Sequence, residues 1–139
     1  MNVRDLLKRD EGVVPYVYND SLGYATIGVG HLIDHRKGGY LPPELIDALL
    51  DWDIKQKHDA LDKALPWWEK LDEVRQAVLL SMAFNLGLDG LIGFHQTLTM
   101  IEAGQYEQAA AAMLQSKWAQ QVGARAQRLA TQMRTGQWT

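Results

Sequence analysis

The 139-residue sequence predicts a mostly helical α+β fold, in which a small lobe with a β-hairpin is joined by a long helix to a helical lobe. Three patterns predict it: alternating apolar residues over 13–27 around a polar turn, a helical period over 43–65, and Gly-separated helical stretches that follow. Apolar residues make up 47% and charged residues 22%, which is typical of one globular domain and excludes a disordered chain.

The N-terminal part is expected to form a helix followed by the hairpin. Asn2 is a favourable N-cap and Gly12 is favourable just past a helix end, so Glu11 is expected on the last turn. The negative end of the helix dipole lies there, which is a poor place for a charged carboxylate but a useful one for a proton donor. The hairpin places Asp20 in its turn and Thr26 on the returning strand, and segment 35–39 is expected to be a loop.

The remaining chain is expected to be helical. The long helix begins with proline at its permitted first positions and ends before Pro66. Asp72 is the expected N-cap of the next helix, and Leu86-Gly87 is the expected end of that helix. Shorter helices are expected over 91–94, 96–103, 105–115 and 122–134. Core packing is the preferred interpretation for most of the tryptophans at 67, 68, 118 and 138, although each could stack on a sugar.

Composition excludes several classes of site and partner. The chain has no cysteine, which excludes disulfides, and His35, His58 and His95 lack a ligand spacing such as H-E-x-x-H, so neither metal nor cofactor is expected. After Glu107 the chain has bases and no acid, and solvated helix faces are preferred over a polyanion-binding surface. No helix shows the dense basic face of a DNA-binding protein. The first twenty residues hold no apolar run suited to a signal peptide or membrane anchor, so synthesis in a cytoplasm is expected.

Two carboxylates and a hydroxyl occur in one short N-terminal segment, as Glu11, Asp20 and Thr26. A pair of carboxylates is the minimum equipment for hydrolysing a glycosidic bond with water. Taken singly, Glu11 is better explained as a surface residue, Asp20 as a turn former and Thr26 as a strand former.

The order and spacing of these residues carry a resemblance to a known family. The matching motifs run colinearly through nearly the whole chain: Glu11-Gly12, Tyr18-x-Asp20, Gly23-Tyr24-x-Thr26-Ile27-Gly28-x-Gly30-His31-Leu32, Leu71-Asp72-x-Val74-Arg75, Met82-x-Phe84-x-x-Gly87, Gly93-Phe94, Arg125-Ala126-x-Arg128 and Arg134-Thr135-Gly136-x-Trp138. Together they resemble the phage-type lysozymes, or endolysins, which are muramidases. The joint match favours the catalytic interpretation of the three residues over the separate ones.

The resemblance implies a lysozyme that causes bacterial lysis by hydrolysing the β-1,4 bond between N-acetylmuramic acid and N-acetylglucosamine in peptidoglycan. Glu11 would be the general acid, and Asp20 and Thr26 would position and activate water for a single displacement without cofactor. The substrate would lie in a cleft between a small lobe, at about 12–41, and a helical lobe of 66–139 plus 1–11, joined by helix 43–65 within a single domain.

Supporting residues follow from the same resemblance. Leu32, Phe84 and Thr97 match positions that line sugar subsites, and Arg125 matches a basic residue that meets the catalytic acid. His31 and Asp53 match a buried ion pair that fixes the hairpin against the long helix. Two departures are a shorter loop between Leu32 and Pro42, which could mean a missing strand or fewer subsites, and Ala112 at a position that is polar in some relatives.

The resemblance also sets expectations for partners and location. A monomer without stable membrane insertion is expected, with a separate holin-like protein giving access to the cell wall in the periplasm after the membrane is permeabilised. Two other functions stay open at this point: a lysozyme-like module that binds glycan or a protein without turnover, and a transglycosylase that leaves an anhydro sugar.

Overall fold

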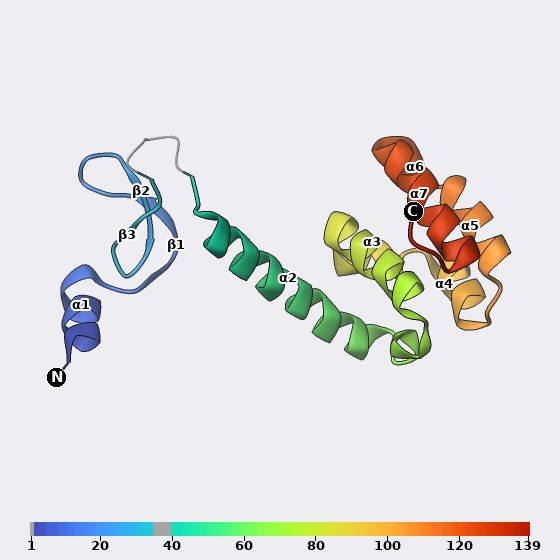
Figure 1. Ribbon diagram of the computed structural model, residues 1–139, viewed down its shortest axis with the longest axis horizontal. Helices are drawn as coiled ribbons and strands as arrows, with labels where there is room; N and C mark the ends of the chain where they lie inside the picture. The colour runs from blue at the N-terminus through green and yellow to red at the C-terminus, as the bar shows by residue number, and fades with distance from the viewer. Residues whose placement is uncertain (1, 35–39) are drawn as a thin grey trace. The chain divides into compact units, whose positions relative to one another are not determined.

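The computed structural model describes residues 2–34 and 40–139, and the chain divides into two compact units, Met1–Leu50 and Asp51–Thr139 (Figure 1). The first unit contains helix α1 (Val3–Glu11) and strands β1 (Val14–Asn19), β2 (Ala25–Gly28) and β3 (His31–Leu32). The loop predicted over 35–39 lies outside the described residues. The prediction that residues 1–11 belong with the helical lobe stays a prediction.

Helix α1 has the limits that its capping residues predict. The side chain of Asn2 accepts a hydrogen bond from the backbone N–H of Asp5 at 3.0 Å, which satisfies one of the free donors at the helix start. Gly12 ends the helix with φ 80°, a left-handed value that favours glycine. Glu11 is therefore the last helical residue, as predicted.

The strands form one antiparallel sheet in the order β1-β2-β3. Tyr18 pairs with Thr26 across β1 and β2, and Thr26 pairs with Leu32 across β2 and β3. The predicted hairpin is confirmed. The two-residue strand β3 was not predicted, because so short a segment has no alternation of its own and is defined by pairing with β2.

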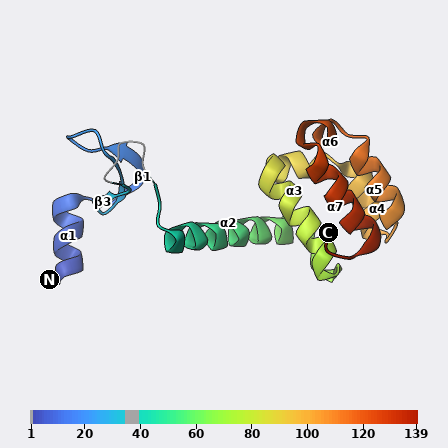
Figure 2. The ribbon, with the colours of Figure 1, turned by 45° about the horizontal axis from the view of Figure 1, so that its top comes forward.

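Helix α2 (Pro43–Ala64) confirms the predicted long helix and continues from the first unit into the second. The second unit then contains the short 3₁₀ helix η1 (Trp68–Lys70) and helices α3 (Glu73–Ile92), α4 (His95–Glu102), α5 (Tyr106–Leu114), α6 (Lys117–Val122) and α7 (Ala124–Thr135). Figures 1 and 2 both show α5 and α7 side by side. No single helix in the described ranges is long and apolar enough to cross a membrane, although α3 and α4 together pass by length and composition with a bend of 106° between them.

Helix α3 confirms one prediction and corrects another. Asp72 caps its start, since the carboxylate accepts the backbone N–H of Arg75 at 3.0 Å. Gly87 leaves the helical conformation as predicted, with φ 75°, but the chain resumes a helical turn and continues to Ile92. The separate short helix predicted over 91–94 is therefore wrong. Helix α6, which begins after the N-cap Ser116, was not predicted.

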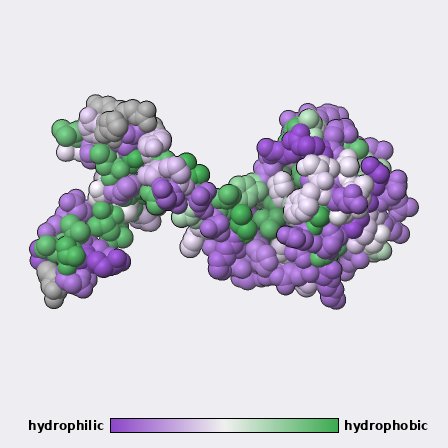
Figure 3. Space-filling view, viewed as in Figure 1, coloured by the Kyte–Doolittle hydropathy of each residue, from purple (hydrophilic) through white to green (hydrophobic). Residues whose placement is uncertain are grey.

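The core of the second unit is formed by apolar side chains from all of its helices. Its largest fully buried members are Trp68, Leu61, Leu79, Met82, Leu91, Ile101, Met113, Met133 and Val78. The indole N–H of Trp68 donates to Asp62 at 2.7 Å and that of Trp118 donates to Asn85 at 3.0 Å, so both buried rings keep a polar partner. Core packing is thus confirmed for these two tryptophans, and the visible face of this unit is mainly hydrophilic (Figure 3).

Arg75 connects the start of α3 to the end of α7. Its guanidinium donates to the backbone carbonyls of Met133 at 2.7 Å and Arg134 at 3.2 Å, and it forms an ion pair with Asp72 at 2.9 Å. The same group lies 3.6 Å from the centre of the Tyr106 ring. We call these five residues the Arg75 cluster. It joins segments nearly sixty residues apart and supplies partners for carbonyls at a helix C-terminus.

Replacing Asp72 with alanine should lower the free energy of unfolding by about 1 kcal/mol at neutral pH, because the N-cap hydrogen bond is lost. Burial alone would raise the pKa of Asp72, but hydrogen bonds from the Arg75 backbone and guanidinium outweigh burial and hold this pKa below its usual range. A carboxyl with a depressed folded pKa stabilises above its unfolded pKa, and the contribution is lost as pH falls through the folded value. The difference between wild type and variant should therefore shrink below about pH 4.

Urea unfolding at neutral pH and near pH 3 measures this difference. The exposed carboxylate of Glu102 provides a matched control, since Glu102→Ala should change stability little at either pH. A stability loss in Asp72→Ala that is the same at both pH values would contradict the assigned role of the carboxylate charge.

Candidate functional site

The Glu11 side chain lies directly against the backbone of Gly30, in the turn between β2 and β3. A Cβ atom added to Gly30 would lie 2.8 Å from Glu11 Oε2 and 3.1 Å from its Cδ. Gly30 also has φ 60°, in the left-handed region. The backbone conformation therefore favours glycine at this position, and a larger residue would have to displace the Glu11 carboxylate.

Replacing Gly30 with alanine should reduce the lytic activity that the resemblance implies by about a hundredfold, because the new methyl group displaces the carboxylate of the predicted acid Glu11 and catalysis is sensitive to a shift of about 1 Å. The left-handed backbone should also cost about 1–2 kcal/mol of stability. Turbidity loss of a peptidoglycan suspension measures the activity, and thermal unfolding measures the stability.

Gly104 offers a matched control in the second unit. It has φ 78°, and an added Cβ would meet nothing within 4 Å. Gly104→Ala should therefore carry a similar backbone cost and keep its lytic activity. Equal activities of the two variants would show that the contact with Glu11 has no functional role.

The Asp20 carboxylate is held by the turn that follows it. Its Oδ1 accepts the backbone N–H groups of Leu22 and Tyr24, both at 2.9 Å. The backbone of Asp20 also bonds within this turn, donating to the Tyr24 carbonyl at 2.9 Å and accepting from Gly23 at 3.0 Å. The local sequence of Asn, Asp, Ser and Gly favours this geometry, and the carboxylate is fixed by it.

Thr26 is joined to Asp20 through a single residue, Tyr24. The Thr26 hydroxyl is buried, with 4% of the residue exposed, and donates to the Tyr24 carbonyl at 3.0 Å. The Tyr24 N–H donates to Asp20, so the peptide groups of one residue hold both candidate side chains. The structure thus brings Asp20 and Thr26 together, as predicted, while the backbone role of Tyr24 had no sequence signal beyond its place in the turn.

Leu32 lies beside Thr26, as its paired residue on β3. It is 43% exposed, whereas Thr26 is buried. Side chains of directly opposed residues share one face of a sheet. This places the predicted subsite residue next to the hydroxyl, within the first unit.

The second unit contains a pocket of ≈ 470 Å³ that includes the predicted subsite residue Thr97. The other lining residues are Gly93, Phe94, His95, Gln96, Ala112, Gln115 and Ser116. Amides, hydroxyls and an aromatic ring are the groups that hold sugars in protein sites. Phe84, the other predicted subsite residue of this unit, is 44% exposed on α3. The glutamines were not identified from sequence, because Gln is common on helix surfaces.

The chain matches the family model described as "Phage lysozyme" over residues 8–135. It belongs to the phage lysozyme family. It is 26% identical over 161 residues to "Probable T4-type lysozyme 1" of Dictyostelium discoideum, with 97% of this chain and 95% of the relative covered. It is 32% identical over 113 residues to the endolysin of Salmonella phage P22, with 78% of this chain and 75% of that protein covered.

Another relative, a phage spike protein, is much longer than this phage lysozyme family member. The sequence is 31% identical over 161 residues to the pre-baseplate central spike protein Gp5 of Enterobacteria phage T4, covering 98% of this chain and 28% of the spike protein. Family membership confirms the predicted class, a lysozyme-type glycoside hydrolase of a family that acts on peptidoglycan. The predicted mostly helical α+β fold is confirmed as well.

Each pair of supporting residues predicted for this family member has one residue in each unit. Glu11 and His31 belong to the first unit, and their predicted partners Arg125 and Asp53 belong to the second. Both pairings, and the catalytic roles of the three N-terminal residues, stay predictions.

Proposed function

We propose that this chain is an endolysin-type muramidase that cleaves the β-1,4 bond between N-acetylmuramic acid and N-acetylglucosamine by a single displacement. The observation that carries the mechanism is the pair of side chains held by Tyr24: the Asp20 carboxylate and the Thr26 hydroxyl. A carboxylate and a hydroxyl fixed by one backbone segment are suited to orienting one water molecule.

The hydrogen bonds support a distinct role for each oxygen of this pair. Oδ1 of Asp20 already accepts two N–H groups, so Oδ2 is the oxygen that would take the proton from water. The Thr26 hydroxyl donates its own hydrogen to Tyr24, so it would act towards water as an acceptor. A water that donates one hydrogen to each group has a lone pair left for the anomeric carbon.

Glu11 would supply the proton for the leaving group. Protonation of the glycosidic oxygen by Glu11 accompanies cleavage of the carbon–oxygen bond, while Asp20 accepts the proton of the attacking water. The reaction ends with an inverted sugar carrying the new hydroxyl, a protonated Asp20 and a charged Glu11, which exchange protons with solvent before the next cycle. Such a mechanism needs the two carboxyl groups about 6.5–9.5 Å apart to leave room for water.

The same proposal gives roles to the remaining predicted residues. Leu32, Phe84 and Thr97 would contact the glycan strand, and Arg125 would meet Glu11. The pair of His31 and Asp53 would hold the hairpin to helix α2. A monomer that reaches the wall through a separate holin-like protein is part of the proposal.

Product analysis tests the reaction. Purified protein is incubated with bacterial peptidoglycan in isotope-labelled water, and the soluble fragments are analysed by mass spectrometry. We expect falling turbidity and fragments with a free reducing end that contains one labelled oxygen. Anhydro sugars lighter by one water would indicate a transglycosylase, and wall binding without fragments would indicate a binding module. Either result would overturn the proposed hydrolysis.

A further inference from the structure

A histidine-centred cluster lies in the second unit, where the end of α2 meets η1. His58 Nδ1 is 3.4 Å from Asp62 Oδ2 and 3.9 Å from Asp59 Oδ1, and one ligand atom from each of the three residues lies within 4.8 Å of the others. On the other side of the ring, His58 Nε2 is 3.1 Å from Glu69 Oε1. We call these four residues the His58 cluster. None of them has a role in the proposed hydrolysis.

Each of the three converging side chains also uses its other polar atom to contact a neighbouring group. The second oxygen of Asp59, Oδ2, pairs with Lys55 Nζ at 2.7 Å. The second oxygen of Asp62, Oδ1, accepts the indole N–H of Trp68 at 2.7 Å. The imidazole is held by Glu69, and its ring lies edge-on to Trp68 with 4.9 Å between centroids. The contacts with Lys55, Trp68 and Glu69 therefore hold in place the three ligand atoms that face one another.

The contact with Glu69 also decides which imidazole nitrogen faces the two aspartates. His58 Nε2 lies 3.1 Å from Glu69 Oε1, whereas Nδ1 is the ring nitrogen close to Asp59 and Asp62. An imidazole nitrogen and two carboxylate oxygens, which are common metal ligands, therefore converge. Two carboxylates this close repel each other, and a cation between them would relieve the repulsion.

We propose that the His58 cluster binds a divalent first-row metal ion of the zinc type, with His58 Nδ1, Asp59 Oδ1 and Asp62 Oδ2 as ligands and water in the fourth position. Zinc bonds of about 2.0–2.2 Å in a tetrahedron place neighbouring ligand atoms about 3.3–3.6 Å apart. The pair of His58 and Asp62 has this spacing at 3.4 Å, whereas Asp59 Oδ1, which is 3.9 Å from Nδ1, has to move closer to complete the site. A ligating histidine that donates its other N–H to a carboxylate is the usual arrangement around protein zinc.

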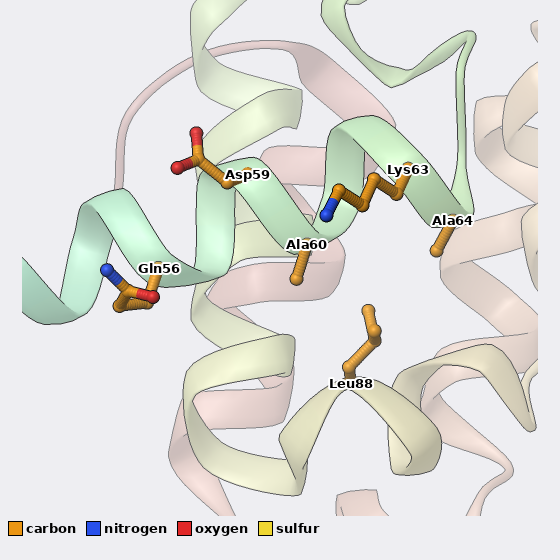
Figure 4. Close-up of a pocket in the computed structure, with 6 residues that line it drawn as sticks. All are labelled: Gln56, Asp59, Ala60, Lys63, Ala64 and Leu88. Atoms are coloured by element: carbon orange, nitrogen blue, oxygen red, sulfur yellow. The ribbon is translucent and has the colours of Figure 1, made fainter.

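The proposed site is separate from the groove next to it. Asp59 borders a groove of ≈ 390 Å³ that is also lined by Gln56, Ala60, Lys63, Ala64 and Leu88. Figure 4 shows Ala60 and Ala64 facing Leu88 across this groove, whereas the Asp59 carboxylate points away from Leu88. The metal would therefore bind on the side of α2 where Glu69 of η1 contacts His58, and all three of its protein ligands would come from α2.

Calorimetric titration with zinc chloride in a non-chelating buffer tests the proposal on the full chain. We expect one saturable site and an unfolding temperature that rises with zinc concentration. Cobalt should give the strong visible absorption of a tetrahedral complex. His58→Ala should abolish both signals, and Glu69→Gln, which keeps all three ligands, should weaken zinc binding by about tenfold or more.

Two further variants make the result decisive. Asp62→Asn keeps an acceptor for Trp68 but turns an amide N–H₂ towards His58, so it should fold as wild type and lose zinc binding. His95→Ala removes an imidazole from α4 and should bind zinc as wild type does. The proposal is overturned if the wild type shows no saturable binding, or if folded His58→Ala or Asp62→Asn binds as tightly as the wild type.

Discussion

Replacing Glu11 with glutamine should leave a folded protein whose lytic rate falls by about a hundredfold to ten-thousandfold. Glutamine has the size of glutamate and fits the same space beside Gly30, so the contact seen in the structure is kept. It has no acidic proton to give to the glycosidic oxygen, and the leaving group must then depart as an alkoxide. The rate of turbidity loss, with circular dichroism as the check on folding, measures the effect.

Asp10 provides the matched control, one residue earlier on the same helix. It makes an exposed ion pair with Arg9 at 2.8 Å, and exposed pairs of this kind contribute little to stability. Asp10→Asn makes the same change of charge and should keep wild-type activity. If Glu11→Gln lysed peptidoglycan as fast as Asp10→Asn, Glu11 would not be the acid.

Replacing Asp20 with asparagine should lower activity by about a hundredfold or more while unfolding stays near the wild-type temperature. The Oδ1 atom of asparagine accepts the N–H groups of Leu22 and Tyr24 as the carboxylate does, so the turn is preserved. The base that takes a proton from water is lost. Asp20→Ala should lose the activity too, and should also cost about 1–3 kcal/mol because two backbone donors lose their partner.

Comparing the two variants separates catalysis from folding. Activity is measured as turbidity loss, and stability as the urea midpoint at fixed temperature. Ser21→Ala, in the same turn but exposed, should be near wild type in both measurements. An active Asp20→Asn together with an inactive Asp20→Ala would limit Asp20 to a structural role.

Helix starts and turns that depend on hydrogen bonds between residues close in sequence were predictable from the sequence. Asn2 and Asp72 cap their helices because each side chain bonds to a backbone N–H three residues later, and such a bond needs nothing from the rest of the protein. The turn at Asp20 is local in the same sense. The proximity of Asp20 and Thr26 was therefore predictable from the hairpin, while the catalytic roles of these two residues and of Glu11 stay predictions.

Features that depend on distant partners could not be predicted in this way. Strand β3 exists because it pairs with β2, and the turn after Gly87 returns to helix although glycine usually marks an end. No metal was expected from the sequence, because His58 and Asp62 match no common ligand spacing. The contribution of Glu69 becomes visible only once η1 packs against α2.

The Arg75 cluster has a consequence for how the protein is made. The guanidinium at the start of α3 donates its hydrogen bonds to carbonyls of residues 133 and 134, so this helix lacks those partners until both residues have left the ribosome. Buried Met133 becomes available equally late. The second unit is therefore expected to fold only once its last helix has been synthesised, in contrast to the first unit, whose strands pair over short distances in sequence.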